Sequence, residues 1–242
     1  MASSVAKPAN GAARMKKRVL VVDIGGTHVK LMISPAEARK FDSGPRLTPR
    51  QLLAGIRKTT EDWKYDAISM GFPSVVRKGR IVKEAKHLAP GWIGENLRKS
   101  LGKPVRVLND AAMQALGSYR GGRMLFLGLG TGLGSALLWP GHLLPLELGD
   151  LPYEGGRVEE VLGKVGFDRL GKKAWTRQVL FCLERLRLSF IADYIVLGGG
   201  LSKEFATLPE GVKPGDNRNV YLGGLRMWET DPKTRRPKWV VL

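Results

Sequence analysis

Two glycine-rich turns, one in each half of the chain, constrain the fold more than any other feature. The first is Gly25-Gly26-Thr27 within VVDIGGTHVK, and the second runs from Gly130 to Gly134 within GLGTGLGSAL. Each turn lies between two apolar segments that have the length and composition of buried strands. The strand–turn–strand unit at 18–33 therefore recurs at 124–139. This recurrence predicts two similar units that face each other across a cleft.

Strand-like and helix-like segments alternate along the rest of the chain, a pattern typical of α/β proteins. Thr48-Pro49-Arg50-Gln51 predicts the start of a helix, with Thr48 as its cap and the proline at the first helical position. Further helices are expected at 93–101, 111–119 and 175–190, whereas 140–156 is expected to be irregular.

Three segments follow from these patterns. Residues 1–18 are small, polar and basic and contain no apolar segment, so we expect a flexible basic tail and not a secretory signal. An N-terminal α/β domain is expected at 19–110 and a C-terminal α/β domain at 111–242, with the break close to Asn109.

Composition narrows the class of protein. The chain of 242 residues carries a net charge of +18, which favours polyanionic partners such as nucleic acid, polyphosphate and nucleotides. No apolar stretch approaches the roughly 20 residues that cross a bilayer, so no membrane partner is expected. Cys182 is the single cysteine, which excludes an intrachain disulfide and a cysteine-based zinc site and agrees with a cytoplasmic location.

The two glycine turns are suited to binding phosphate. Neither matches the G-x-x-x-x-G-K-[ST] phosphate loop, and each lies between strands. Exposed backbone N–H groups in such turns form concave anion sites, and glycine lets phosphate oxygens approach the main chain. Thr27 and Thr131 add a hydroxyl donor to each turn. The alternative is that both are ordinary hairpin turns.

Acidic residues at two strand ends are candidates for chemistry. Asp23 ends an apolar strand, where a buried carboxylate is costly unless a cation or donors meet it. A metal-bridged phosphate would supply that partner, and capping of the turn's own N–H groups is the alternative. Asn109 and Asp110 end another strand between the two halves. Asp110 could accept a proton from a substrate hydroxyl, and the alternative is an N-cap for the helix that follows.

Six motifs in order, DIGGTHVK, GFPSVV, LND, GLGTGLGSAL, ELG and GGGLS, resemble those of the ROK sugar kinases in the actin-like ATPase superfamily. GFPSVVRKGRI followed by GWIG is most similar to the polyphosphate glucokinase branch, and Trp92 of GWIG is therefore a candidate ligand contact. The resemblance spans about 19–227. It implies a two-domain α/β fold of the actin-like ATPase (ribonuclease H-like) class with a central cleft, and a homodimer.

The resemblance also implies roles for single residues. Asp23 would lie beside Mg²⁺ and the transferring phosphoryl group, and Asp110 would be the catalytic base. The sugar would be bound by Asn109, Asp110, Glu147, Gly71 and Pro73. The phosphate or nucleotide groups would be bound by Asp23, Gly25, Gly26, Thr27, Lys30, Gly130, Thr131, Gly132, Gly134, Gly198, Gly199 and Gly200.

Two departures from the family pattern qualify the expected function. The family's Glu-x-Gly-His reads Glu147-Leu148-Gly149-Asp150, so a carboxylate replaces an imidazole beside the sugar. The zinc-binding cysteine cluster of many relatives is missing, so no zinc site is expected.

We expect a Mg²⁺-dependent kinase that transfers a phosphoryl group from polyphosphate, ATP or both to the 6-hydroxyl of glucose. The alternatives are an ATP-dependent kinase for another hexose and a degenerate protein that binds sugar or polyphosphate without turnover. A DNA-binding repressor of the same family is disfavoured, because only about 18 residues precede the first strand and leave no room for a helix-turn-helix.

Overall fold

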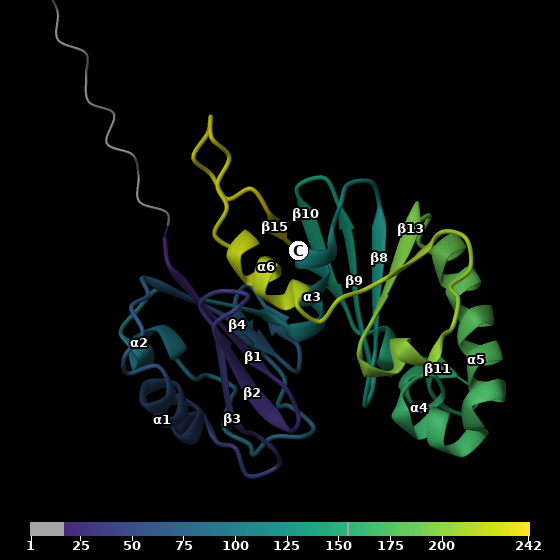
Figure 1. Ribbon diagram of the computed structural model, residues 1–242, viewed down its shortest axis with the longest axis horizontal. Helices are drawn as coiled ribbons and strands as arrows, with labels where there is room; N and C mark the ends of the chain where they lie inside the picture. Colours follow the sequence, from purple (N-terminus) through teal and green to yellow (C-terminus); the bar gives the residue numbers. More distant parts are fainter. Residues whose placement is uncertain (1–16, 154) are drawn as a thin grey trace, which may run out of the picture.

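The computed structural model describes residues 17–153 and 155–242, arranged as two lobes that are each built on one sheet (Figure 1). Residues 1–16 of the expected tail lie outside the described part. The first sheet has the order β3-β2-β1-β4-β7. Its strands are β1 (Val19–Ile24), β2 (His28–Met32), β3 (Ala38–Asp42), β4 (Ala67–Phe72) and β7 (Val105–Asn109). Strands β1 to β3 form an antiparallel meander, and β4 and β7 run parallel to β1.

The second sheet repeats this topology. Its order is β14-β13-β8-β9-β10-β15, and β10-β9-β8-β13-β14 has the same sequence of pairings as β3-β2-β1-β4-β7. The strands are β8 (Met124–Leu129), β9 (Leu133–Trp139), β10 (His142–Leu146), β13 (Tyr194–Gly198), β14 (Val212–Pro214) and β15 (Val240–Val241). The predicted recurrence of the strand–turn–strand unit is confirmed, and it extends to the whole sheet.

Helices cover the outer sides of both sheets. The first lobe carries α1 (Pro49–Thr59) and α2 (Leu97–Leu101), and the second carries α4 (Val158–Leu162) and α5 (Lys164–Ser189) (Figure 1). Short elements complete the lobes: β5 (Val76–Arg77), β6 (Arg80–Ile81), β11 (Pro152–Tyr153), β12 (Gly156–Arg157), η1 (Leu148–Asp150) and η2 (Gly200–Glu204). Within the described residues, no helix is both long enough and apolar enough to cross a bilayer.

Two helices lie between the sheets, and each packs against the sheet of the other lobe. Helix α3 (Asp110–Ser118) follows β7 of the first sheet but contacts β8, β9 and β10 of the second. Helix α6 (Asn219–Arg226) follows β14 of the second sheet but contacts β1 and β4 of the first. The two helices touch through glycines: a Cβ added at Gly223 would lie 1.8 Å from the carbonyl oxygen of Met113. All strands of the first sheet come from 19–110 and all strands of the second from 111–242, and we propose these ranges as the domains.

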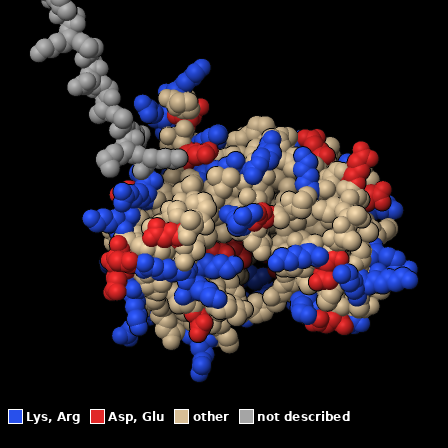
Figure 2. Space-filling model, in the orientation of Figure 1, with Lys and Arg blue, Asp and Glu red and all other residues tan. Residues whose placement is uncertain are grey.

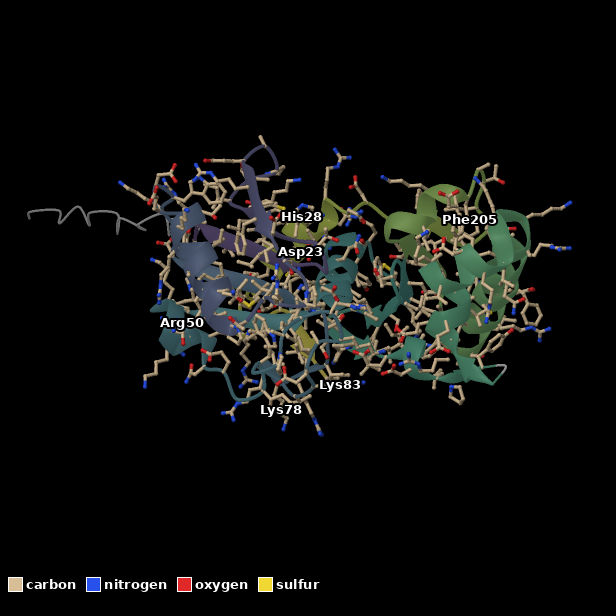
Figure 3. All side chains as sticks on the ribbon, turned by 90° about the horizontal axis from the view of Figure 1, so that it is seen from below. Asp23, His28, Arg50, Lys78, Lys83 and Phe205 are labelled. Carbon is tan, nitrogen blue, oxygen red and sulfur yellow. The ribbon has the colours of Figure 1, made fainter. Side chains whose placement is uncertain are left out.

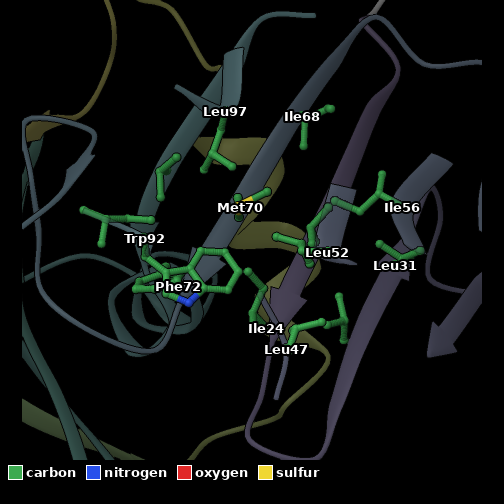
Figure 4. Packing of buried hydrophobic residues seen from close by; sticks show 14 of the residues in the cluster. Ile24, Leu31, Leu47, Leu52, Ile56, Ile68, Met70, Phe72, Trp92 and Leu97 are labelled. Carbon is green, nitrogen blue, oxygen red and sulfur yellow. The ribbon is translucent and has the colours of Figure 1, made fainter. Parts of the chain in front are cut away.

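The core of the first lobe explains the position of Trp92. Apolar side chains of β1, β2, β4 and α1 pack together, and Trp92 lies against Phe72 at a centroid distance of 5.1 Å (Figure 4). Trp92 is fully buried, and its indole N–H donates to the carbonyl of Ala89 (2.6 Å). It therefore anchors the GWIG segment in the core and does not line the cleft, contrary to its interpretation as a ligand contact.

The capping motif predicted the start of α1 correctly, whereas two other expected segments differ from the structure. Thr48 caps α1, and Gln51 completes the capping box by accepting from the backbone N–H of Thr48 (2.9 Å). The predicted irregular stretch 140–156 is wrong in part, because β10 pairs there with β9 and buries Leu143 opposite Leu138. Helix α5 begins at Lys164, eleven residues before the expected 175, and contains a kink at Gly171 (φ 71°).

Candidate active site

A cavity of about 360 Å³ lies between the lobes and is lined by residues of both. Figure 2 shows the molecule hollowed between its two halves, with Lys and Arg side chains beside the opening. Most of the predicted site residues line the cavity: Asp23, Gly25, Gly26, Lys30, Pro73, Asn109, Asp110, Gly130, Thr131, Gly132, Gly134, Glu147 and Gly199. Residues far apart in the sequence are thus brought together around one space.

Four predicted site residues lie outside the cavity lining. Gly71 is in β4 behind Asp110, and a Cβ added there would meet the Asp110 Cα at 3.3 Å. Thr27 is exposed, and its carbonyl accepts from the Ser43 N–H (2.9 Å). Gly198 ends β13, and Gly200 begins η2.

The two glycine turns enter the cavity from opposite lobes. The first follows β1, where the Gly25 N–H donates to the carbonyl of His28 (3.0 Å). The second follows β8, where the Gly130 N–H donates to the carbonyl of Gly132 (3.0 Å). Glycine is required at Gly134, because a Cβ there would lie 2.5 Å from the Ala111 Cβ at the start of α3. Backbone from both turns thus lies at the cavity wall, where an anion can approach it.

Asp23 supplies a carboxylate between the turns. It lies opposite Lys30 in the β1–β2 register, and burial raises its pKa while the charge of Lys30 opposes that shift. The alternative role for Asp23 is to cap the N–H groups of its own turn. The Gly25 N–H is not capped in this way, because it donates to the carbonyl of His28. A carboxylate on a cavity wall beside the backbone of two glycine turns suits Mg²⁺, which proteins hold through one or two carboxylates together with substrate phosphates. Among residues 17–153 and 155–242, no three His, Cys, Asp or Glu side chains group as a metal site.

Asp110 lies at the first position of α3. Asn109 is the N-cap: its side-chain oxygen accepts from the Ala112 N–H (3.0 Å), and its amide donates to the carbonyl of Ser74 (3.3 Å). Burial, followed by the negative charges of Asp23 and Glu147, raises the pKa of Asp110 to about 7. A carboxyl with a pKa near neutrality can accept a proton from a hydroxyl during a reaction and release it afterwards.

The loop that carries Glu147 is surrounded by charges that the sequence did not reveal. Burial and the charge of Asp150 raise the pKa of Glu147, and Lys83 and Lys86 act in the opposite direction. Asp150, which replaces the family's histidine, pairs with Lys83 (3.0 Å) and Lys86 (3.2 Å). The hydrogen bond from Lys83 is the largest cause that lowers the pKa of Asp150. Asp150 is therefore already engaged by cations.

Other cavity residues also escaped prediction. The Gln114 side-chain amide donates to the Asn217 side-chain oxygen (2.8 Å), and both line the cavity with Gly199. Lys83, Lys86 and Glu159 line it as well. Gln114 and Asn217 are 103 positions apart and belong to no motif, so only the tertiary structure pairs them. In Figure 3, Asp23 and Lys83 lie in the middle of the molecule, between Arg50 of the first lobe and Phe205 of the second.

Comparison with known proteins adds sequence relatives to this geometry. The model of the ROK family matches residues 19–145. The chain is 27% identical over 213 residues to a polyphosphate glucokinase of Mycobacterium leprae, covering 80% of this chain and 62% of that relative's length. It is 28% identical over 210 residues to a polyphosphate glucokinase of Mycobacterium tuberculosis (strain ATCC 25618 / H37Rv), covering 76% of this chain and 77% of the relative.

Solved structures share the fold. An inorganic polyphosphate/ATP-glucomannokinase from Arthrobacter sp. strain KM superposes with a TM-score of 0.74 at 24% identity, covering 86% of this chain and 96% of the other. A ROK family glucokinase from Streptomyces griseus, in complex with glucose and AMPPNP, gives a TM-score of 0.63 at 17% identity, covering 86% and 97%. Together with the repeated sheet topology, these likenesses confirm the predicted two-domain, actin-like α/β fold.

Proposed function

Since the chain belongs to the ROK family, we propose that it is a sugar kinase that transfers a phosphoryl group to the 6-hydroxyl of glucose. The donor in this proposal is inorganic polyphosphate, ATP or both. The observation that carries the proposal is the position of Asp110, with its pKa near 7, on the wall of a cavity that two glycine turns enter. The relatives described as polyphosphate glucokinases support glucose as the acceptor and polyphosphate as a donor.

The proposed reaction divides the cavity into a sugar end and a donor end. Asn109 and Glu147 hold the sugar, and Asp110 takes the proton of the 6-hydroxyl as that oxygen attacks the terminal phosphorus. The bond from this phosphorus to its bridging oxygen breaks, which leaves ADP or a polyphosphate one unit shorter. The protein's main work in such a transfer is to position the reactants and to neutralise charge.

The donor would lie along the two turns. Backbone N–H groups of Gly26 and Gly132 and the Thr131 hydroxyl are the proposed contacts for its phosphate oxygens, with Lys30 beside them. Gly25, whose N–H is engaged by His28, would contribute close approach of its backbone and no donor. Asp23 would hold Mg²⁺, which when bound supplies positive charge to the transferring phosphoryl group. Gln114, Asn217 and Gly199 line the same cavity and complete the proposed donor end.

A coupled assay for glucose 6-phosphate, run separately with polyphosphate and with ATP across a small panel of hexoses, tests the proposal. Asp110→Asn should lower kcat by roughly 10²- to 10⁴-fold, because the base is lost. Calorimetry should show that the same variant still binds glucose. Turnover of no hexose with either donor would exclude the kinase.

Asp150 favours one alternative, a kinase for another hexose. A carboxylate held by Lys83 and Lys86 presents different hydrogen-bonding groups from an imidazole, so the hydroxyl pattern accepted beside Glu147 can differ from that of glucose. The hexose panel separates these cases, and binding without turnover would indicate the degenerate protein. The homodimer that the resemblance implies and the cytoplasmic location that the single cysteine agrees with remain parts of the proposal.

A further inference from the structure

A cluster of five charged residues joins the two lobes beside the cavity. It consists of Lys83, Lys86, Asp150, Arg157 and Glu159, and we refer to it as the cross-lobe cluster. Lys86 pairs with Glu159 (2.6 Å) and Asp150 (3.2 Å), and Lys83 pairs with Asp150 (3.0 Å). Arg157 lies against Asp150 (3.4 Å) and Glu159 (3.1 Å). The two lysines follow β6 in the first lobe, whereas the other three residues belong to the second.

Of the two lysines that the first lobe contributes, Lys86 contacts both Asp150 and Glu159, whereas Lys83 pairs with Asp150. Asp150 ends the short helix that directly follows Glu147, the proposed sugar ligand. Glu159 is the least exposed member, at 19%, and a Cβ added at Gly132 would lie 2.5 Å from its Oε2. The Lys86 ammonium group of the first lobe therefore contacts two carboxylates of the second lobe, one in the Glu147 loop and one beside the second glycine turn.

We propose that Lys86 is a positioning residue for the sugar site, and that the cross-lobe cluster holds the Glu147 loop of one lobe against the 82–91 segment of the other. This inference rests on the proposed function, because it takes the space beside Glu147 to be the sugar end of the cavity. Lys86 does not take part in the chemistry. Its effect is to keep the two walls of the sugar site at the separation at which both contact the sugar.

The inference has a specific signature, because glucose carries no charge. Salt does not screen the interaction of a neutral ligand with the protein, so a salt-dependent affinity must arise from charges within the protein. Exposed ion pairs contribute about 0.2–1 kcal/mol each, and Lys86 makes two across the lobes. Loss of both, about 0.4–2 kcal/mol together, should weaken glucose binding by about 2- to 30-fold, since 1.4 kcal/mol corresponds to about tenfold.

Calorimetric titration with glucose, without donor, at low and high NaCl tests this on wild type and Lys86→Met. The variant should fold normally, because Arg157 still pairs with Glu159 and Lys83 with Asp150 after the change. We expect the wild-type Kd to rise with salt, within the range of about 2- to 30-fold that two such pairs allow. Lys86→Met should bind glucose more weakly at low salt and lose less affinity with salt than wild type, because only the Lys83–Asp150 pair of the cluster then joins the lobes. In the kinetic assay, KM for the sugar should rise while kcat changes little.

Lys172→Met is the matched control. Lys172 pairs with Glu204 (3.1 Å) as a surface ion pair, but both residues belong to the second lobe. This variant should bind glucose as wild type does, with the same salt dependence. A double-mutant cycle with Glu159→Gln isolates the contact: Lys86→Met should have a smaller effect in the Glu159→Gln background, because one of its two partners is already lost.

Hydrogen exchange in the absence of sugar separates failure of this inference from failure of the proposed function. Lys86→Met should speed exchange in both lobes together, at the Ala89 amide, which bonds to Leu47, and at the Asp150 amide, which bonds to Glu147. If no hexose binds, the proposed function fails, and exchange alone decides the role of Lys86. Unchanged exchange at both amides, or an equal effect of Lys172→Met, overturns the inference, as does unchanged glucose affinity where glucose binds.

Discussion

Replacement of Asp110 by Asn should stabilise the protein at neutral and alkaline pH while it removes the proposed base. Burial, with the charges of Asp23 and Glu147, raises the pKa of Asp110 from 3.8 to about 7. At about 1.4 kcal/mol for each pH unit, this difference corresponds to about 4 kcal/mol of folding free energy. The asparagine oxygen can still accept the hydrogen bond that Asp110 accepts from the Ala111 N–H (2.8 Å), so the start of α3 keeps that contact.

The sign of this effect depends on pH in a defined way. Below pH 3.8 the carboxyl group is protonated in both folded and unfolded protein, and it costs nothing. Between pH 3.8 and about 7 the unfolded chain releases its proton while the folded protein keeps it, so the cost grows with pH. Above about pH 7 the cost is complete. Asp110→Asn should therefore gain about 2 kcal/mol at pH 5 and about 4 kcal/mol at pH 8.5.

Urea unfolding of wild type and Asp110→Asn at these two pH values measures the difference, with the slope of the transition checked for equality between them. Glucose and phosphate are left out, because a bound ligand would stabilise the folded state on its own. A free-energy difference that does not grow with pH would refute the reasoning, since it would mean that Asp110 titrates alike in both states. A loss of stability at pH 8.5 would refute it more directly.

The pH dependence of catalysis and the packing of α6 give two further expected outcomes. Because Asp110 must be ionised to accept a proton, kcat/KM for the sugar should fall about tenfold for each pH unit below about pH 7, in inverse proportion to the proton concentration. A pH-independent rate would contradict the proposed role of Asp110 as the base. Gly223→Ala should destabilise the protein by about 1–3 kcal/mol or more in urea unfolding, because its Cβ would lie 1.8 Å from the backbone oxygen of Met113. Gly55→Ala, which meets the movable end of the Phe41 ring at 2.6 Å, should cost less, and equal losses would contradict the argument.

Local patterns predicted those parts of the fold in which neighbouring residues decide the conformation. The two hairpins were predictable because each turn is marked by glycines between apolar runs, and α1 was predictable because Thr48 and Gln51 form a capping box within four residues. β10 was missed because Gly141 directly precedes it and Pro145 interrupts its run of apolar residues. Its strand conformation is stabilised by pairing with β9, which supplies an apolar partner for Leu143.

The residues of the candidate site also differ in whether local sequence could identify them. Three site residues could be predicted from local sequence, because each stands where an apolar strand ends: Asp23, Asn109 and Asp110. A polar side chain at such a point is costly to bury unless a partner or ligand meets it. The cross-lobe cluster was not predictable, because Lys86 meets Asp150 and Glu159 at separations of 64 and 73 positions. Lysines in a polar segment are normally solvated, so nothing local distinguishes Lys86 from its neighbours. Its partners are determined only by how the two lobes pack.

The repeated topology raises the question of why the two hairpins carry different residues. Asp23 faces Lys30 at the mouth of the first hairpin, whereas Gly128 faces Gly134 at the corresponding place in the second. A second carboxylate there would add negative charge to a cavity that is proposed to hold phosphate, and would repel it. A side chain at Gly134 would collide with the start of α3 and displace Asp110. The two sheets can therefore share one topology while their hairpins differ in side chains. The first hairpin supplies charged groups, and the second must keep glycine at 134 so that Asp110, the proposed base, stays at the cavity wall.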